Sequence, residues 1–246
     1  MRSLLPVFAI VLPLGAQWIR ITTPGIPRNS NGTPNLNAPA PRLADGTPDL
    51  AGIWRFSPPF NNDYTTGLKP EEILPWAREL YTQRRDGNLK DQPSTHCLPG
   101  AVIDYGVFMK IVQTPGLILL LSEIPGNNTT RQIHLDGRVL PVDPNPTWQG
   151  YSVAHWEADT LVVETSGYND RVWLDHIGHP HTEALRVIER FRRRDFGHLD
   201  VEITFNDPGA YTRSWSINIP RTVVADTEIF EAFCENERDS RHFVGQ

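Results

Sequence analysis

From residue 107 onward the chain is a series of short segments rich in β-branched and aromatic residues, and this pattern limits the fold most. The segments are separated by short connections that contain Gly, Pro, Asp or Asn, with no helical period between them. Such a series excludes alternating strand–helix units and favours a β-barrel or a two-sheet sandwich. The expected strands are 107–114, 117–124, 131–135, 138–142, 151–156, 160–165, 183–192, 198–205, 212–219 and 227–234.

We expect residues 50–246 to form a single antiparallel β-barrel, lipocalin-like in class, with about ten strands and one helix. Proline is abundant, with 22 residues among 246, and proline interrupts long helices but is tolerated in turns and at strand edges. The dipeptide Asp136-Gly137 joins two of the expected strands and is the strongest hairpin signal in the chain. A two-sheet sandwich is the alternative.

One helix is expected over residues 70–85. Pro70 suits the first helical turn, and Arg84 and Arg85 suit the C-terminal end, where the helix dipole favours positive charge. Pro75 is expected to delay the start of the regular helix.

Two segments precede the expected barrel. Residues 1–16 combine a short positive start, an apolar stretch and the small residue Ala16, which is typical of a secretory signal peptide. A buried N-terminal strand is the alternative. Residues 17–49 are rich in Pro, Asn and Thr, so we expect an extended arm that runs over the barrel surface or stays mobile. Within this arm, the pattern of residues 27–36 recurs fourteen residues later.

The chain contains two cysteines, Cys97 and Cys234. Their separation excludes a Cys-x-x-Cys motif, and in an oxidising compartment the pair predicts one structural disulfide. Two independent buried thiols are the alternative. Together with the leader, the cysteines predict a secreted or periplasmic protein, and the sequence contains no apolar stretch long enough for a membrane span.

The formal net charge of −6 argues against nucleic-acid binding. The sequence contains no Gly-rich phosphate-binding motif, no Gly-x-Ser-x-Gly elbow and no zinc-finger spacing. We therefore expect no nucleotide cofactor, and a small-molecule or carbohydrate ligand as the partner. The oligomeric state does not follow from the sequence.

A cluster of histidines is the first candidate site. The spacing His176-x-x-His179-x-His181-x-Glu183 places the last three residues on one face if the stretch is a strand. Imidazole with carboxylate suits one divalent transition metal ion: Zn, Fe, Mn or Cu. A proline and a glycine within the stretch leave an alternative, in which the histidines lie exposed in a loop and Glu183 pairs with an arginine.

Two carboxylates and an arginine are the second candidate site. Glu183 and Glu189 are six residues apart, on one face of a regular strand, and Arg190 lies on the other face. Paired carboxylates can act as general acid and base on a sugar or an ester, while an arginine can hold developing negative charge. Ion pairing with nearby arginines is the structural alternative.

Aromatic residues are the third candidate site. Trp156, Trp173 and Trp215 lie near expected turns, where an indole ring can stack on a sugar or a flat aromatic ligand. Tryptophan is also a common core residue of β-sheets, so the alternative is that these residues have a purely structural role.

The segment 41–54, PRLADGTPDLAGIW, resembles the opening of an uncharacterised group of secreted proteins from soil bacteria, acidobacteria in particular. The resemblance covers most of residues 41–236, and it implies secretion and a β-rich fold but no activity. Another residue, often Ser, stands at the position of His181 in such sequences, whereas Glu183 and residues 189–191 match. The resemblance thus points to Glu183, Glu189 and Arg190 as a shared polar set. The other similar stretches are 113–116, 156–165, 206–208, 211–212 and Trp215.

Two classes of function are compatible with these patterns. The first is a secreted, metal-assisted hydrolase or lyase that acts on a carbohydrate or a small organic substrate. The second is a non-catalytic barrel that binds an apolar or aromatic small molecule. A third possibility, compatible with the extended arm, is a module for assembly at a surface.

Overall fold

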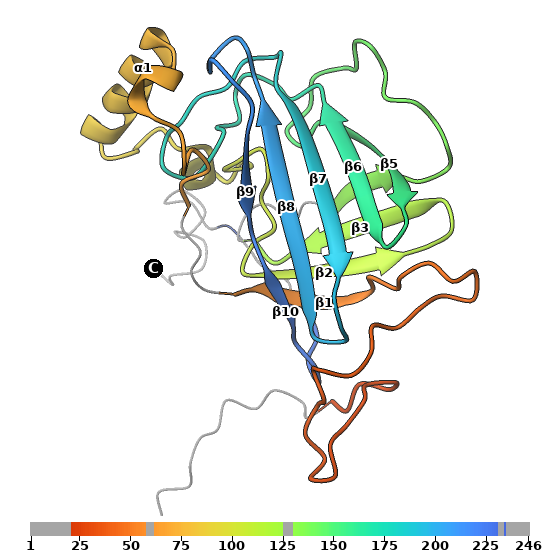
Figure 1. The fold of residues 1–246 in the computed structure, drawn as a ribbon. Helices are drawn as coiled ribbons and strands as arrows, with labels where there is room; N and C mark the ends of the chain where they lie inside the picture. The colour runs from red at the N-terminus through yellow and green to blue at the C-terminus, as the bar shows by residue number, and fades with distance from the viewer. Residues whose placement is uncertain (1–20, 58–61, 125–129, 231–233, 235–246) are drawn as a thin grey trace, which may run out of the picture.

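Ten strands within the described residues form one sheet in the computed structural model; nine of them close into a barrel and one lies outside (Figure 1). The structure describes residues 21–57, 62–124, 130–230 and 234. The strands are β1 (Gly52–Phe56), β2 (Phe108–Gln113), β3 (Leu117–Ser122), β4 (Thr130–His134), β5 (Tyr151–Glu157), β6 (Thr160–Ser166), β7 (Arg186–Arg193), β8 (His198–Asn206), β9 (Trp215–Asn218) and β10 (Arg221–Val223). Strands β1 to β8 follow one another in chain order, and β10 pairs with both β1 and β8 to close the ring. The predicted β-barrel is confirmed.

The barrel is mixed, not purely antiparallel as predicted. Strands β4 and β5 run parallel over a short contact, with Ile133 opposite Ser152 and His134 opposite Val153. A parallel neighbour needs a connection that returns to the same end of the sheet, and residues 135–150 supply it.

The predicted hairpin at Asp136-Gly137 is wrong, because residues 138–142 do not form a strand. Val139 and Val142 are 83% and 94% exposed, so the apolar side chains of this segment do not pack against the core. The turn signal is local, whereas a strand forms only where a neighbour and a buried face are present. The chain therefore continues as an irregular connection to β5.

Other strand boundaries also differ from the prediction. Strand β7 begins at Arg186, three residues later than expected, and the expected strand 212–219 is reduced to β9. Residues 227–230 are irregular, and of the rest of the expected strand 227–234 only Cys234 is described. The barrel is closed by β10 and not by a strand at 227–234, and the sequence pattern does not predict β10.

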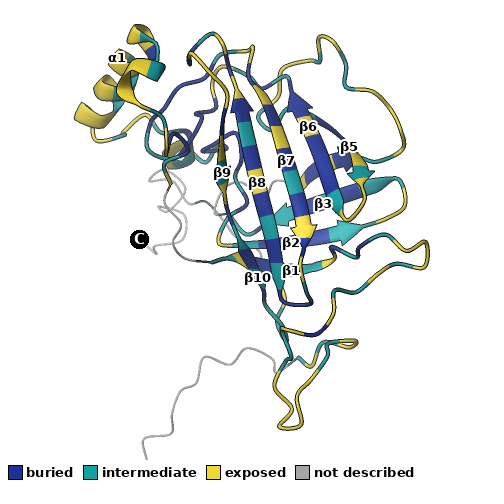
Figure 2. Ribbon diagram, viewed as in Figure 1, coloured by how far each residue is buried: buried dark blue, intermediate teal, exposed yellow. Residues whose placement is uncertain are grey.

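The core lies inside the barrel, where inward side chains alternate with outward ones. Along β8 the buried residues are Leu199, Val201, Ile203 and Phe205, and Figure 2 shows the alternation of buried and more exposed positions on this strand. Each fully buried side chain of this size contributes about 1.5–3 kcal/mol to folding. The alternation thus fixes which face of each strand turns inward.

A single α-helix within the described residues, α1 (Pro75–Asp86), packs outside the barrel (Figure 1). Pro75 is its first residue, so the expected helix 70–85 begins late, after a 3-10 turn at Pro70–Glu72. The Trp76 indole donates a hydrogen bond to the Gly209 carbonyl (2.9 Å), which fixes the start of the helix on the loop after β8.

The N-terminal arm contains two copies of the same small hairpin, which matches the duplicated sequence. In each copy an arginine donates to a carbonyl of its own hairpin and pairs with an aspartate of the main body. Arg28 pairs with Asp226 (2.6 Å), and Arg42 pairs with Asp159 (2.8 Å). The predicted leader, residues 1–16, lies outside the described residues.

The predicted disulfide is confirmed: Cys97 is bonded to Cys234, with Cα atoms 5.6 Å apart. It joins the segment in front of β2 to the end of the described chain. Within the described residues, no helix is long and apolar enough to cross a membrane.

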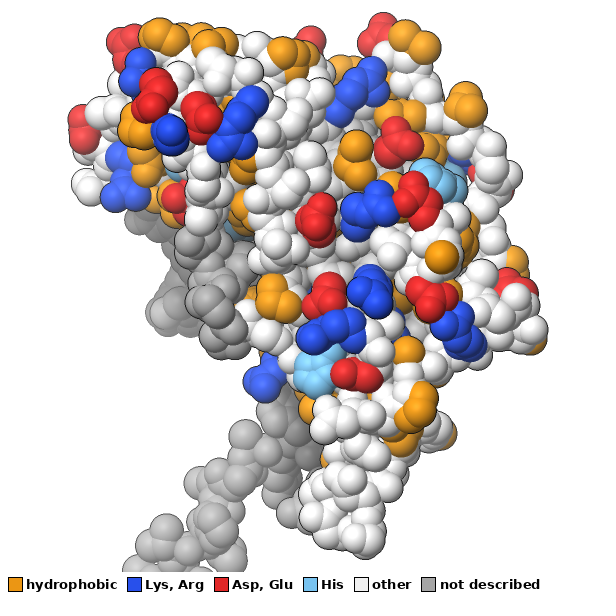
Figure 3. Space-filling model, viewed as in Figure 1, with side chains coloured by type: hydrophobic (Ala, Val, Ile, Leu, Met, Phe, Trp, Pro, Cys, Tyr) orange, Lys and Arg blue, Asp and Glu red, His pale blue; other side chains and the backbone are white. Residues whose placement is uncertain are grey.

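The outer surface of the barrel carries both signs of charge. Figure 3 shows basic and acidic side chains interspersed on the face that carries β7 and β8. Charged side chains on the outer surface form close ion pairs, including Arg190 with Glu157 (2.5 Å) and Arg194 with Asp200 (2.9 Å).

Candidate functional site

The segment 98–106 leads into β2 at one end of the barrel and is mostly buried. Ala101, Val102 and Ile103 of this segment are 1–2% exposed, and the Val102 amide donates to the Trp173 carbonyl (2.9 Å). Gly100 permits this path, because a Cβ atom there would lie 3.0 Å from the ring of His176. The segment therefore packs at this end of the barrel, here called the barrel mouth, and carries polar side chains with it.

A cavity of about 580 Å³ lies beside this segment at the barrel mouth. This volume falls in the range of small-molecule sites. Its walls combine apolar side chains with several polar ones. The lining residues are Phe56, Asn62, Tyr64, Gln92, Asp104, Tyr105, Gly106, Val107, Glu123, Ile124, His176, Ile219 and Arg221.

Arg221, the first residue of β10, is the most unusual group in this cavity. The residue is 3% exposed, yet its Nε and Nη1 atoms have no hydrogen-bond partner among the described residues. Its guanidinium lies over the Tyr105 ring, with 4.7 Å from Cζ to the ring centroid. Burial lowers the pKa of Arg221 to about 10, so the group stays charged at neutral pH.

Two further polar atoms in the wall lack partners. Asp104 Oδ2 and the Tyr105 hydroxyl are buried and make no hydrogen bond within the described residues. The other oxygen, Asp104 Oδ1, lies 3.5 Å from His176 Nε2. Burial alone would lower the pKa of His176, but the hydrogen bond and charge of Asp104 outweigh it and raise the pKa. Because buried polar groups are normally satisfied, this clustering of unsatisfied atoms points to a ligand site.

Deeper in the barrel lies a fully satisfied ion pair. Arg131 on β4 forms a bidentate pair with Glu189 on β7 and also donates to Ser152 Oγ (3.1 Å) and Thr165 Oγ1 (2.8 Å). A void of about 10 Å³, lined by Arg131 together with Asp104 and Tyr105, adjoins both this pair and the cavity. The guanidinium of Arg131 is therefore paired with Glu189, whereas Arg221 Nε and Nη1 have no hydrogen-bond partner within the described residues.

A second polar cluster lies outside the barrel, beneath α1. One donor atom each from Asp63, Asp175 and His179 lies within 4.8 Å of the others, so the group can hold a metal ion. The His179 ring stacks on Tyr81 with centroids 4.0 Å apart, and its Nε2 atom faces Thr65 Oγ1 at 3.3 Å.

Asp175 organises this cluster. Its Oδ1 atom accepts the amides of Ile177, Gly178 and His179 at 3.0–3.1 Å, and its Oδ2 atom accepts the Tyr64 amide (3.1 Å) and His179 Nδ1 (2.6 Å). Five hydrogen bonds to one fully buried carboxylate fix the loop that carries the histidines.

The four predicted metal ligands are not brought together as the strand model requires. The stretch 176–185 is a loop, because β7 starts only at Arg186. His176 lines the barrel-mouth cavity, and among the four only His179 belongs to the metal-compatible group in the described chain. His181 donates Nδ1–H to the Thr182 carbonyl (2.9 Å), and burial lowers the pKa of its ring.

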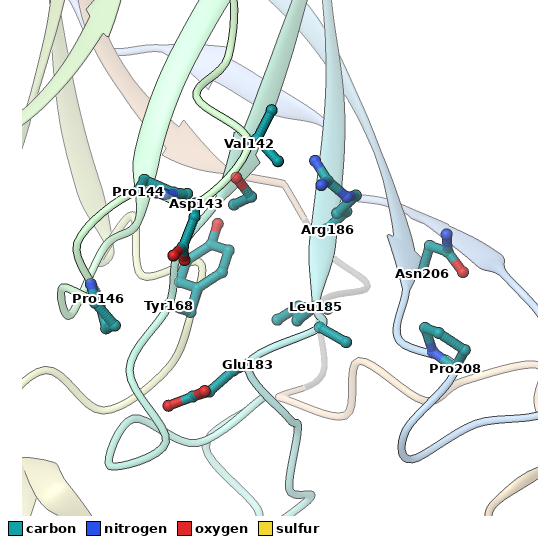
Figure 4. A pocket seen from close by; sticks show the side chains of 13 residues that line it. Val142, Asp143, Pro144, Pro146, Tyr168, Glu183, Leu185, Arg186, Asn206 and Pro208 are labelled. Atoms are coloured by element: carbon teal, nitrogen blue, oxygen red, sulfur yellow. The ribbon is translucent and has the colours of Figure 1, made fainter.

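Glu183 is exposed and lies at a different pocket, of about 420 Å³, at the same end of the barrel. Figure 4 shows its carboxylate on the side of Tyr168 and away from Arg186. The alternative of exposed histidines does not hold either, since His179 and His181 are 4% and 7% exposed.

Glu189 and Arg190 lie on opposite faces of β7. Glu189 is fully buried in the barrel with Arg131, whereas Arg190 pairs with Glu157 on the outer surface. Glu183, Glu189 and Arg190 therefore do not meet in one site.

The three tryptophans are also separated. Trp173 lies under the guanidinium of Arg84 (4.3 Å), and Trp215 is buried and donates Nε1–H to the Tyr64 carbonyl (2.6 Å). Trp156 packs against the core and lines another pocket, together with Leu43 and Leu135. None of the three lines the barrel-mouth cavity.

Comparisons with protein-family models, with curated proteins and with solved structures gave no match to this chain.

Proposed function

We propose that this protein binds a small organic anion in the barrel-mouth cavity, with the anionic group on Arg221. The apolar part of the ligand contacts Phe56, Val107, Ile124 and Ile219, which line the same cavity. This refines the apolar or aromatic ligand expected from the sequence, because the polar wall adds a charge requirement.

The single observation that carries the proposal is the unsatisfied guanidinium of Arg221. A buried charge without a partner destabilises the fold, because desolvation is not offset by hydrogen bonds. Nε and Nη1 are both without a partner among the described residues. They lie on different edges of the guanidinium, and a carboxylate can contact either edge in a bidentate way, accepting from Nε and Nη2 or from Nη1 and Nη2. A bound carboxylate would supply the missing partner.

The cellular location forms part of the proposal. We propose that the barrel acts outside the cytoplasm, as a secreted or periplasmic protein. The Cys97–Cys234 disulfide supports this, because such bonds persist mainly in oxidising compartments.

Calorimetric titration with phenylacetate and with its neutral analogue phenylacetamide tests the binding proposal. Wild-type protein should bind phenylacetate and bind phenylacetamide much more weakly. Replacing Arg221 with Gln should weaken phenylacetate binding about tenfold or more, because charge-assisted hydrogen bonds are lost.

The matched control is Arg186→Gln, which removes an arginine at the other pocket of the same barrel end. This variant should bind phenylacetate as the wild type does. Equal binding of the acid and the amide, or unchanged binding by Arg221→Gln, would contradict the proposal.

A second candidate function is metal-assisted hydrolysis or elimination at Asp63, Asp175 and His179. The observation that favours it is the convergence of one imidazole and two carboxylates within 4.8 Å. Such a donor set suits Zn²⁺, Fe²⁺ or Mn²⁺, and a bound ion would acidify a water molecule or polarise a carbonyl.

Metal content after incubation with Zn²⁺ or Mn²⁺ and desalting tests this second function. We expect about one ion per chain in the wild type and loss of the ion in His179→Ala and Asp63→Asn. His155→Ala is the matched control, because His155 is an exposed histidine on the barrel surface. Asp175 is left intact because its five hydrogen bonds hold the loop. Metal-free wild-type protein after this treatment would rule the function out.

A further inference from the structure

The polar wall next to Arg221 restricts the ligand further. We infer that the ligand carries a hydrogen-bond donor, an ammonium or hydroxyl group, close to its carboxylate, and that Asp104 and Tyr105 recognise this donor. The inference rests on the proposed function and names the chemical class of its ligand: α-amino or α-hydroxy acids with an apolar side chain.

Asp104 supplies the first argument. Its side chain is 7% exposed, and an ionised carboxylate can only accept hydrogen bonds. Oδ1 faces His176, but Oδ2 has no partner among the described residues. The cavity wall thus contains a negatively charged hydrogen-bond acceptor without a partner, and a ligand ammonium or hydroxyl group would satisfy it.

The position of this acceptor relative to Arg221 supplies the second argument. The charge of Asp104 acts on Arg221, yet Arg221 Nε and Nη1 and Asp104 Oδ2 each remain without a hydrogen-bond partner in the described chain. Opposite charges that face one cavity without pairing are complementary to a ligand that carries both an anionic group and a donor.

Tyr105 supplies the third argument. Its ring lies beneath the Arg221 guanidinium, and its buried hydroxyl has no partner in the described structure. This contact fixes the position of the ring, and with it the direction of the hydroxyl, in the cavity wall. A phenol can donate and accept, so it can contact a carboxylate oxygen and a ligand donor at once.

Three probes with one carbon skeleton test the inference: phenylacetate, mandelate and phenylglycine, the last two as separate enantiomers. They share the ring and the carboxylate and differ only in hydrogen, hydroxyl or ammonium at the α-carbon. We expect one enantiomer of mandelate or phenylglycine to bind at least about tenfold more tightly than phenylacetate. If mandelate binds more tightly the preferred donor is a hydroxyl group, and if phenylglycine does it is an ammonium group.

The variants Asp104→Asn and Tyr105→Phe should reduce this preference, measured as the ratio of the affinity for the preferred acid to the affinity for phenylacetate. Glu183→Gln is the matched control, because it removes an exposed acid at the other pocket of the same barrel end. It should leave the preference unchanged. Thermal melting of each variant verifies that it is folded, and Tyr105→Phe keeps the ring beneath Arg221.

Different results would contradict the anion site and the recognition of a ligand donor. Tight phenylacetate binding with no gain for mandelate or phenylglycine overturns the inference and leaves the anion site standing. A preference that survives in both Asp104→Asn and Tyr105→Phe overturns it as well. Absence of binding for all three acids overturns the proposed function itself.

Discussion

Replacing Arg131 with Met should lower the free energy of unfolding by about 3–5 kcal/mol, because it leaves the buried Glu189 carboxylate without its counter-charge. Glu189 is 0% exposed and Arg131 is 7% exposed. Complete burial raises the pKa of Glu189 and lowers that of Arg131, so each side chain depends on the other to stay charged. Total domain stability is only about 5–15 kcal/mol, so this loss is large.

Urea denaturation of the single and double variants measures this effect. The double variant Arg131→Met with Glu189→Met should recover much of the loss, because apolar side chains replace a buried pair with little change in stability. Arg221→Met should leave stability unchanged or increased, since Arg221 Nε and Nη1 have no hydrogen bond to lose within the described residues. A loss below about 1 kcal/mol for Arg131→Met would contradict this role of the pair.

Removal of the disulfide is the second large effect that we expect. The bond closes a loop with a sequence separation of 137 residues. In the chain-entropy model such a loop stabilises the folded state by about 4–5 kcal/mol. The variant Cys97→Ser with Cys234→Ser should therefore melt at a markedly lower temperature than the wild type.

Melting curves with and without dithiothreitol measure this effect. Reductant should lower the melting temperature of the wild type to that of the double serine variant, and should leave the variant itself unchanged. Equal melting temperatures of wild type and variant under oxidising conditions would show that the bond contributes nothing to stability.

The barrel could be predicted because its strands carry their own signals. Segments such as 160–165 and 198–205 have β-branched residues, period-two alternation and turn residues at their ends, and they form β6 and β8. The parallel contact of β4 with β5 could not be predicted. The local turn at Asp136-Gly137 is indistinguishable in sequence from a hairpin, and only the missing core surface at 138–142 prevents one.

The candidate site was harder to predict, because its residues come from distant segments. Asp104 and Tyr105 precede β2, and Arg221 starts β10, so their approach depends on closure of the barrel. The spacing of the histidine motif brings its side chains to one face only on a strand. The hydrogen bonds of Asp175 to the amides of residues 177–179 hold the stretch as a loop instead. A lone arginine in a three-residue strand gives no sequence signal.

A crystal structure of the protein grown with the tightest-binding aromatic acid tests the central claim most directly. We predict the ligand carboxylate at hydrogen-bond distance, about 2.7–3.0 Å, from two neighbouring nitrogens of Arg221, either Nε and Nη2 or Nη1 and Nη2, with the aromatic ring against Val107 and Ile219. A ligand bound elsewhere, or an Arg221 guanidinium that pairs only with protein groups while the acid occupies another pocket, would contradict the claim.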